Sequence, residues 1–252
     1  MSDVREAVRE RYAAAALRIA ETEAASCCGE GEVSVGCCGS YGSADLAAVG
    51  MSAGSSLGCG NPTLLAGLRP GEVVLDLGSG AGLDVLLSAP RVAPGGRAYG
   101  VDMTDEMLRL ARQNQARAGI ENASFLKGTI DSVPLPDAAV DVVISNCVIN
   151  LAEDKGAVIR EAFRLLRPGG RLAVADMVEL ERLPDGVKQR LDAWAGCIAG
   201  TIPVDDYRQL LLDAGFDDID IEVTGSQDVD GARGAIGSAQ VRAVKPAGTV
   251  PA

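Results

Sequence analysis

The stretch "VVLDLGSGAGLD", residues 73–84, decides the fold. Its first five residues are an apolar run typical of a buried strand, and a helical pattern starts at the end of the stretch. Between them stand Gly78, Gly80 and Gly82, which let the backbone turn tightly and approach a ligand closely. We therefore expect a strand, a glycine-rich turn and a helix, with a ligand bound at the turn.

Short apolar runs alternate with helical patterns on the C-terminal side of this stretch. Such alternation favours an α/β fold with a doubly wound, mostly parallel sheet, here of seven strands. The predicted strands are 73–77, 97–101, 123–127, 140–145, 171–178, 217–223 and 237–244, and the predicted helices between them are 83–89, 105–117, 154–166, 186–199 and 204–213.

The N-terminal part of the chain has a different composition. Residues 3–23 predict a helix, whereas residues 26–62 are rich in Gly, Ser and Cys and lack sustained periodicity, which is typical of a loop or lid with one short helix. We expect residues 1–62 to form an N-terminal helix with a Cys- and Gly-rich cap, and residues 63–252 to form the main domain.

Charge and hydropathy narrow the class of protein. The 252 residues carry a net charge of −12, which disfavours nucleic acid and anionic membrane surfaces as partners. No apolar run reaches the roughly 18 residues of a membrane span, and the N-terminus lacks the apolar core of a signal peptide. We expect a cytoplasmic protein.

The residues around the glycines indicate what kind of ligand binds. A dinucleotide-binding loop would place a third small residue where this chain has Leu83, and Asp76 suits a cationic ligand better than a phosphate. Asp102 ends the second predicted strand, 26 residues after Asp76, where a carboxylate can accept hydrogen bonds from both hydroxyls of a ribose. Met103 can pack on the face of an adenine ring.

Residues 68–178 resemble the class I S-adenosylmethionine-dependent methyltransferases, through "VLDLGSGAG", "GVDMT", "GTIDSVPLPD", "DVVISN" and "LRPGGRLAVAD". The resemblance implies a Rossmann-like fold and S-adenosylmethionine as cofactor. It also implies that the three glycines line the cofactor, that Asp102 binds ribose, that Ile130 and Asp131 flank adenine, and that Asn146 faces the cofactor. From the residues alone, Asp131 can also be a helix cap and Asn146 a turn residue.

Seven cysteines and no histidine make up an unusual set of side chains. In an open parallel sheet the ligand lies beyond the carboxyl ends of the strands. Cys147 follows the fourth predicted strand, Cys197 lies after the fifth, and Cys59 lies just before the first. Each thiol alone can be a small buried hydrophobe, but together these three can converge on one pocket.

Three thiolates without imidazole favour a soft, thiophilic ion. Trivalent arsenic bound to three sulfurs keeps a lone pair, which can attack a sulfonium methyl group without a general base. Binding requires the thiols to lose their protons, so activity should depend on pH.

The segments "SLGCGNP", "GVDMTDEML", "PLPDAAVDVVISNCVINL" and "GCIAG" resemble the arsenite methyltransferases over most of residues 40–200. The resemblance implies that Cys59, Cys147 and Cys197 bind the arsenic, that arsenite or methylarsenite is the substrate, and that a thiol reductant of the thioredoxin or glutathione type takes part. Many relatives also carry a longer C-terminal domain.

Two other functions stay open at this point. A methyltransferase acting on a quinone or a thiol explains the glycine loop but not the three cysteines. A non-enzymatic protein that binds a metalloid or zinc explains the cysteines but not the cofactor motifs. Cys27, Cys28, Cys37 and Cys38 fit arsenic delivery, disulfide cycling, a zinc site or a dispensable segment, and Trp194 fits either a pocket wall or a core anchor.

Overall fold

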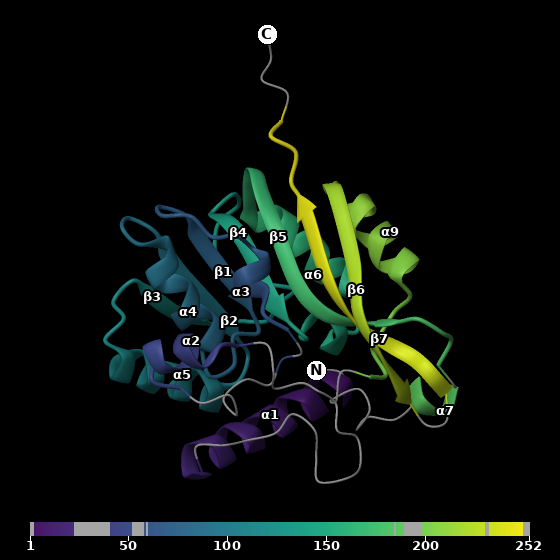
Figure 1. Cartoon of the computed structure of the whole chain (residues 1–252), viewed down its shortest axis with the longest axis horizontal. Helices are drawn as coiled ribbons and strands as arrows, with labels where there is room; N and C mark the ends of the chain where they lie inside the picture. The colour runs from purple at the N-terminus through teal and green to yellow at the C-terminus, as the bar shows by residue number, and fades with distance from the viewer. Residues whose placement is uncertain are drawn as a thin grey trace.

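The computed structural model contains a seven-stranded sheet in the order β3-β2-β1-β4-β5-β7-β6 (Figure 1). The first five strands are parallel, and β7 is antiparallel to both of its neighbours. The predicted doubly wound, mostly parallel sheet is thereby confirmed. The strands are β1 (Val73–Leu77), β2 (Arg97–Asp102), β3 (Ala123–Lys127), β4 (Val140–Asn146), β5 (Leu166–Glu179), β6 (Asp217–Val229) and β7 (Ala232–Val244). The structure describes residues 3–22, 41–51, 58, 60–183, 185–188, 198–229 and 232–248.

Helices connect the strands and cover both faces of the sheet. Of the predicted helix at 186–199, the start is described as α7, residues 189–197 lie outside the described residues, and Ile198 and Ala199 are in a turn rather than in a helix. The helices are α1 (Asp3–Thr22), α2 (Ser43–Ala48), α3 (Pro62–Leu65), α4 (Leu83–Val92), α5 (Asp105–Ala118), the 3-10 turn η2 (Ile149–Leu151), α6 (Lys155–Leu165), α7 (Asp185–Lys188) and α9 (Val204–Ala214).

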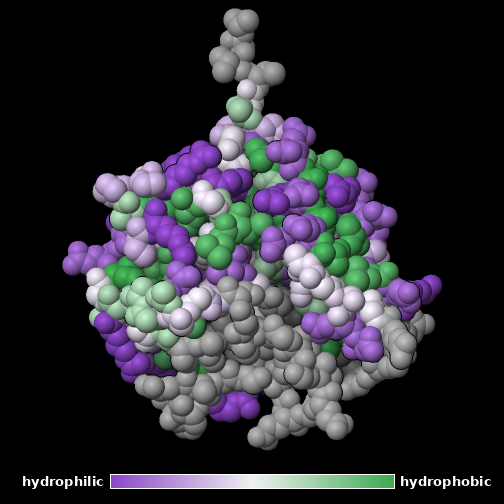
Figure 2. All heavy atoms as spheres, in the orientation of Figure 1, coloured by the Kyte–Doolittle hydropathy of each residue, from purple (hydrophilic) through white to green (hydrophobic). Residues whose placement is uncertain are grey.

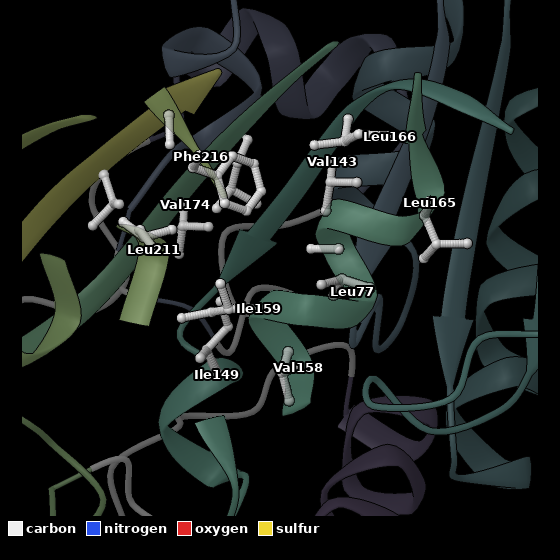
Figure 3. Close-up of a cluster of buried hydrophobic side chains, with 14 of the residues drawn as sticks. Leu77, Val143, Ile149, Val158, Ile159, Leu165, Leu166, Val174, Leu211 and Phe216 are labelled. Atoms are coloured by element: carbon white, nitrogen blue, oxygen red, sulfur yellow. The ribbon is translucent and has the colours of Figure 1, made fainter. Parts of the chain in front are cut away.

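Successive residues of the central strands alternate between two aliphatic cores, as strand geometry requires. Val142 and Ile144 of β4 pack with Ala66 and Val92 on the side of α3 and α4. Val143, between them, joins a larger cluster on the side of α6 and α9. Figure 3 shows Ile159 of α6, Leu211 of α9 and Val174 of β5 meeting in that cluster. These cores fix the direction in which each strand presents its carboxyl end.

Three strands are markedly longer than the sequence pattern predicts, among them β6, which continues to Val229 rather than ending at residue 223. β5 begins at Leu166 rather than at residue 171, because Leu166 pairs with Val140 and the following Gly169 and Gly170 exchange backbone hydrogen bonds with Lys245. β7 begins at Ala232 rather than at residue 237, where it pairs with Val229 of β6. Glycines and polar residues in these extensions conceal the alternation that marks a strand.

The helix α1 crosses the edge of the sheet at which the parallel strands end (Figure 1). Val8, Ala15, Ala16 and Ile19 are buried on one side of this helix, and α1 packs against α5. Elsewhere on the face in Figure 2, hydrophilic residues are interspersed with hydrophobic ones over the described part of the chain. None of the described helices is long and apolar enough to cross a membrane.

Candidate active site

The glycine-rich turn lies at the carboxyl end of β1 and has a left-handed backbone. The φ angles of Gly78, Gly80 and Gly82 are +71°, +50° and +91°, a region that side chains with a Cβ rarely adopt. A Cβ on Gly78 would lie 2.5 Å from Val148 Cγ1, and one on Gly82 would lie 2.7 Å from Phe125 Cζ. At Gly80 the nearest atom would be 4.0 Å away, so this glycine faces open space. Gly78 and Gly80 line a pocket at this turn, whereas Gly82 packs against Phe125 and does not line it.

Carboxylates gather around this turn. Asp76 is 3% exposed, and no hydrogen bond to its carboxylate comes from the residues that the structure describes. Burial, together with the charges of Asp84 and Asp102, holds the pKa of Asp76 well above its ordinary value. A buried carboxylate without a partner is stabilised by a positive charge, so Asp76 is suited to a cationic ligand.

Asp102 at the end of β2 joins two parts of the pocket wall. Its Oδ2 accepts a hydrogen bond from Gly80 N at 3.0 Å, and its Oδ1 accepts one from Thr104 N at 2.8 Å. Burial raises the pKa of Asp102, and these two hydrogen bonds oppose the rise. Each carboxylate oxygen has a second lone pair, which leaves acceptor sites for hydroxyl groups of a ligand.

Asn146, the last residue of β4, fastens the segment before β1 to the sheet. Its Oδ1 accepts from Gly60 N at 3.1 Å, and its Nδ2 donates to Gly60 O at 2.9 Å. The same Nδ2 donates to Tyr41 Oη at 2.8 Å and to Asp84 Oδ2 at 3.3 Å. The side chain lines the pocket, but much of its hydrogen-bonding capacity is used by the protein itself.

Asp84 lies at the centre of this network, in the first turn of α4. Tyr41 donates to both carboxylate oxygens, at 2.8 and 2.7 Å, and Thr63 Oγ1 donates to Oδ1 at 2.9 Å. Burial raises the pKa of Asp84, although the hydrogen bonds from Tyr41, Thr63 and Asn146 favour the ionised form. Sequence reasoning missed both Tyr41 and Asp84, because nothing local to either residue indicates the pairing.

The helix α1 supplies one side of the pocket through Arg5, Val8 and Tyr12. Arg5 forms an ion pair of 2.7 Å with Asp131, whose pKa is lowered because hydrogen bonding to Thr129 and the charge of Arg5 outweigh burial. The sequence analysis missed these three residues. The apolar positions 8, 12, 15 and 19 fall on one helical face and could have revealed the buried side of α1.

Cys147 directly follows β4 and has a left-handed backbone, with φ of +58°. For a residue with a Cβ, this conformation costs about 1–2 kcal/mol unless neighbouring contacts hold it. The side chain is 3% exposed, and the sulfur is in a disulfide bond. The six other cysteines, Cys59 and Cys197 among them, lie outside the described residues.

Cys147 belongs to an apolar cluster next to the pocket, here called the Cys147 cluster. Its buried members are Val8, Cys147, Leu151, Met177, Leu183, Ala199, Val229, Ala235 and Ile236, and Val4, Tyr12, Met103, Val148 and Ile198 pack against it. Five of these residues also line the pocket: Val8, Tyr12, Met103, Val148 and Leu151. The pocket and the surroundings of Cys147 therefore share a wall.

The pocket itself has about 1110 Å³ of empty space, including its open mouth. Eight of the nine residues predicted to bind a cofactor line it, namely Asp76, Gly78, Gly80, Asp102, Met103, Ile130, Asp131 and Asn146, whereas Gly82 does not. The open space at Gly80, and the Asp76 carboxylate that receives no hydrogen bond from the described residues, fit a molecule that carries positive charge and lies close to the backbone. A doubly wound sheet with such a pocket at the carboxyl ends of its parallel strands is what a class I methyltransferase domain requires.

Comparison with known proteins gives the same class. Residues 68–215 match the family model described as a methyltransferase domain. The chain is 44% identical over 234 residues to the arsenite methyltransferase of Halobacterium salinarum, an alignment that covers 87% of this chain and 59% of that protein. It is 32% identical over 152 residues to the human arsenite methyltransferase, covering 57% of this chain and 40% of the relative.

A solved structure narrows the class further. The arsenic(III) S-adenosylmethionine methyltransferase of Chlamydomonas reinhardtii superimposes with a TM-score of 0.69 at 32% identity, covering 82% of this chain and 74% of that one. This chain belongs to the arsenite S-adenosylmethionine methyltransferase family. It spans about half the length of the curated relatives that it matches.

Proposed function

We propose that this protein transfers the methyl group of S-adenosylmethionine to trivalent arsenic held by Cys59, Cys147 and Cys197. When bound, the cofactor supplies a methyl group on a positively charged sulfur, and arsenic on three thiolates offers it a lone pair. The substrate is arsenite or methylarsenite, and the outcome for the cell is arsenic detoxification.

The observation that carries the proposal is the position of the residues next to Cys59 and Cys197, which themselves lie outside the described residues. Gly58 and Gly60, on either side of Cys59, lie so close to β4 and β5 that a Cβ on them would be 2.1 Å from Asn146 Cγ and 2.3 Å from Ala175 Cβ. Ile198 and Ala199, which follow Cys197, pack in the Cys147 cluster. Because a Cα lies about 3.8 Å from the next one along the chain, this placement supports convergence of the three cysteines.

The pocket residues have separate tasks in this proposal. Asp76 offers a negative charge to the positively charged part of the cofactor, and Asp102 offers acceptors to the ribose. Met103 and Ile130 provide apolar contact for the adenine, with Asp131 at its edge. The wall shared with the Cys147 cluster is mostly apolar, so it can exclude water from the path between the sulfonium and the arsenic.

We further propose that a thiol reductant of the thioredoxin or glutathione type acts with the protein. Cys147 is in a disulfide bond, and a sulfur in that state cannot bind arsenic as a thiolate. Two electrons must arrive before the site can take up its substrate. This need fits a reducing compartment such as the cytoplasm.

The test is methylation of arsenite by the reduced protein with labelled S-adenosylmethionine, followed by mass spectrometry of the arsenic species. We expect labelled methylarsenic with the reductant and none without it. Label on a quinone or thiol acceptor but not on arsenic would instead select a small-molecule methyltransferase. Binding of arsenite or zinc without binding of the cofactor would select a sequestration protein.

A further inference from the structure

The turn that carries Cys147 is fastened to β5 at two points. At its start, Cys147 N donates to Ala175 O at 2.8 Å. Three residues later, Asn150 Nδ2 donates to Asp176 Oδ1 at 2.7 Å and to Met177 O at 2.6 Å. The left-handed backbone of Cys147 lies between these two attachments, so its conformation is held at both ends.

The second attachment is a polar group inside an aliphatic core. Asn150 is 0% exposed, Asp176 is 1% exposed, and Tyr207 of α9 beside them is 0% exposed. Asn150 Oδ1, Asp176 Oδ2 and Tyr207 Oη have no hydrogen-bond partner among the residues that the structure describes. Buried polar atoms left in this state destabilise a fold, so stability alone does not account for an asparagine and an aspartate at these positions.

This attachment involves a part of β5 that belongs to the same apolar cluster as Cys147. Asp176 Oδ1 also accepts from Met177 N at 2.9 Å, which fixes the carboxylate to the backbone of β5. Met177 is itself a member of the Cys147 cluster. The Asn150 amide therefore connects the turn to the part of β5 that belongs to the Cys147 cluster.

We propose that Asn150 and Asp176 are positioning residues for the thiol of Cys147, holding its sulfur where arsenic can bind. This inference rests on the proposed function, because arsenic is the ligand that requires the Cys147 sulfur at a fixed position. Three sulfurs must surround one atom, so a displaced Cys147 weakens binding even when the thiol is intact. Partners that orient a ligand of a bound ion are worth about 10–100-fold in affinity in known sites.

The experiment compares Asn150→Leu, which keeps the branched shape and removes the amide, with Asp176→Asn, which keeps an oxygen acceptor for Asn150. Asn122→Ala is the matched control: its amide also donates to two backbone carbonyls, Ala89 O at 2.7 Å and Gly96 O at 3.2 Å, outside the pocket. Asn150→Ser is made beside the leucine variant, so that a folded protein lacking the amide is available if the leucine cannot be accommodated.

Two quantities are measured on each reduced, full-length variant. The first is the rate at which Cys147 is alkylated, from the mass of its peptide. The second is arsenite bound per protein after ultrafiltration, with S-adenosylmethionine affinity measured in parallel. We expect Asn150→Leu or Asn150→Ser to speed alkylation and to lower arsenite affinity by roughly tenfold or more. Cofactor affinity should stay within about twofold, and Asp176→Asn should resemble the unmodified protein.

Unchanged alkylation of Cys147 in both Asn150 variants would overturn the inference. So would an equal change in Asn122→Ala, since that would reveal a general loosening of the fold. If the unmodified protein binds no arsenite, the proposed function fails, yet the alkylation rates still decide whether Asn150 and Asp176 place the thiol.

Discussion

Asn146 and Gly60 form a reciprocal pair of hydrogen bonds, in which the side-chain amide of one residue binds both backbone groups of the other. The pair resembles one rung of a sheet, made by a side chain instead of a strand. It joins the end of β4, next to Cys147, to the residue after Cys59. We regard this pair as one of the links between the N-terminal segment and the core of the protein, beside the Arg5–Asp131 ion pair and the Tyr41–Asp84 hydrogen bonds.

Asn146→Ala should therefore weaken arsenite binding more than cofactor binding. The substitution frees Gly60 from β4 by removing two hydrogen bonds, each worth about 0.5–1.5 kcal/mol, so a fall in arsenite affinity of roughly tenfold or more is expected. Titration of the reduced protein with arsenite and with S-adenosylmethionine measures both. An equal loss of affinity for arsenite and for S-adenosylmethionine would mean that Asn146 acts mainly in binding the cofactor.

Cys147→Ser should abolish methylation of arsenite and leave S-adenosylmethionine affinity within about twofold. A serine hydroxyl does not replace a thiolate as a ligand for a soft ion, and Cys147 packs in its own cluster beside the cofactor pocket. Isothermal calorimetry with the cofactor and mass spectrometry of arsenic products give the two results. Cofactor affinity that drops with activity would show the residue to be structural.

Asp102→Ala should weaken binding of S-adenosylmethionine and leave arsenite binding intact, the opposite of the result expected for Cys147→Ser. Removing the carboxylate takes away the acceptors offered to the ribose and releases Gly80 N and Thr104 N. S-adenosylmethionine should bind more weakly by about 1.5–3 kcal/mol, the scale of hydrogen bonds to a charged group. Arsenite binding to the reduced protein should persist. Asp102→Asn keeps one acceptor and should lose less, and a cofactor affinity that neither variant alters would contradict the assignment.

The stability of the ligand-free protein should fall as the pH rises from about 4 to about 7. Burial raises the pKa of Asp176 from 3.8 to about 7, so in this window the folded chain keeps a proton that the unfolded chain has lost. One such proton corresponds to at most about 1.4 kcal/mol per pH unit. Asp76, Asp84 and Asp102 shift in the same direction.

Denaturant unfolding of the reduced protein at pH 5 and pH 7.5 measures this effect. Asp176→Asn, which carries no titratable group, should show a smaller decrease over the same interval. A free energy of unfolding that increases with pH in the unmodified protein would contradict the prediction.

The sequence was informative wherever the signal was local. The run before Gly78 and the acid at 102 could be placed because strand length and spacing are properties of a short segment. The pairing of Asn146 with Gly60 and Tyr41, and of Arg5 with Asp131, joins residues far apart in the chain. Such contacts depend on how α1 and the segment before β1 fold back, which periodicity does not encode.

For the cysteines, too, local features could be predicted from the sequence and long-range contacts could not. The position of Cys147 at the end of a strand followed from the apolar run before it. Its left-handed backbone and its attachment through Asn150 did not, since both depend on β5. Cys59 and Cys197 lie outside the described residues, so their shared role with Cys147 stays a prediction supported by their neighbours.

The contact between Gly78 and Val148 has an evolutionary consequence. With only 2.5 Å between a Cβ at position 78 and Val148 Cγ1, the glycine-rich turn and the turn that carries Cys147 fit closely against each other. A smaller residue at position 148 would remove this steric clash but not the left-handed φ of +71° at Gly78. Homologues that share this backbone should therefore keep glycine at position 78 even where position 148 varies.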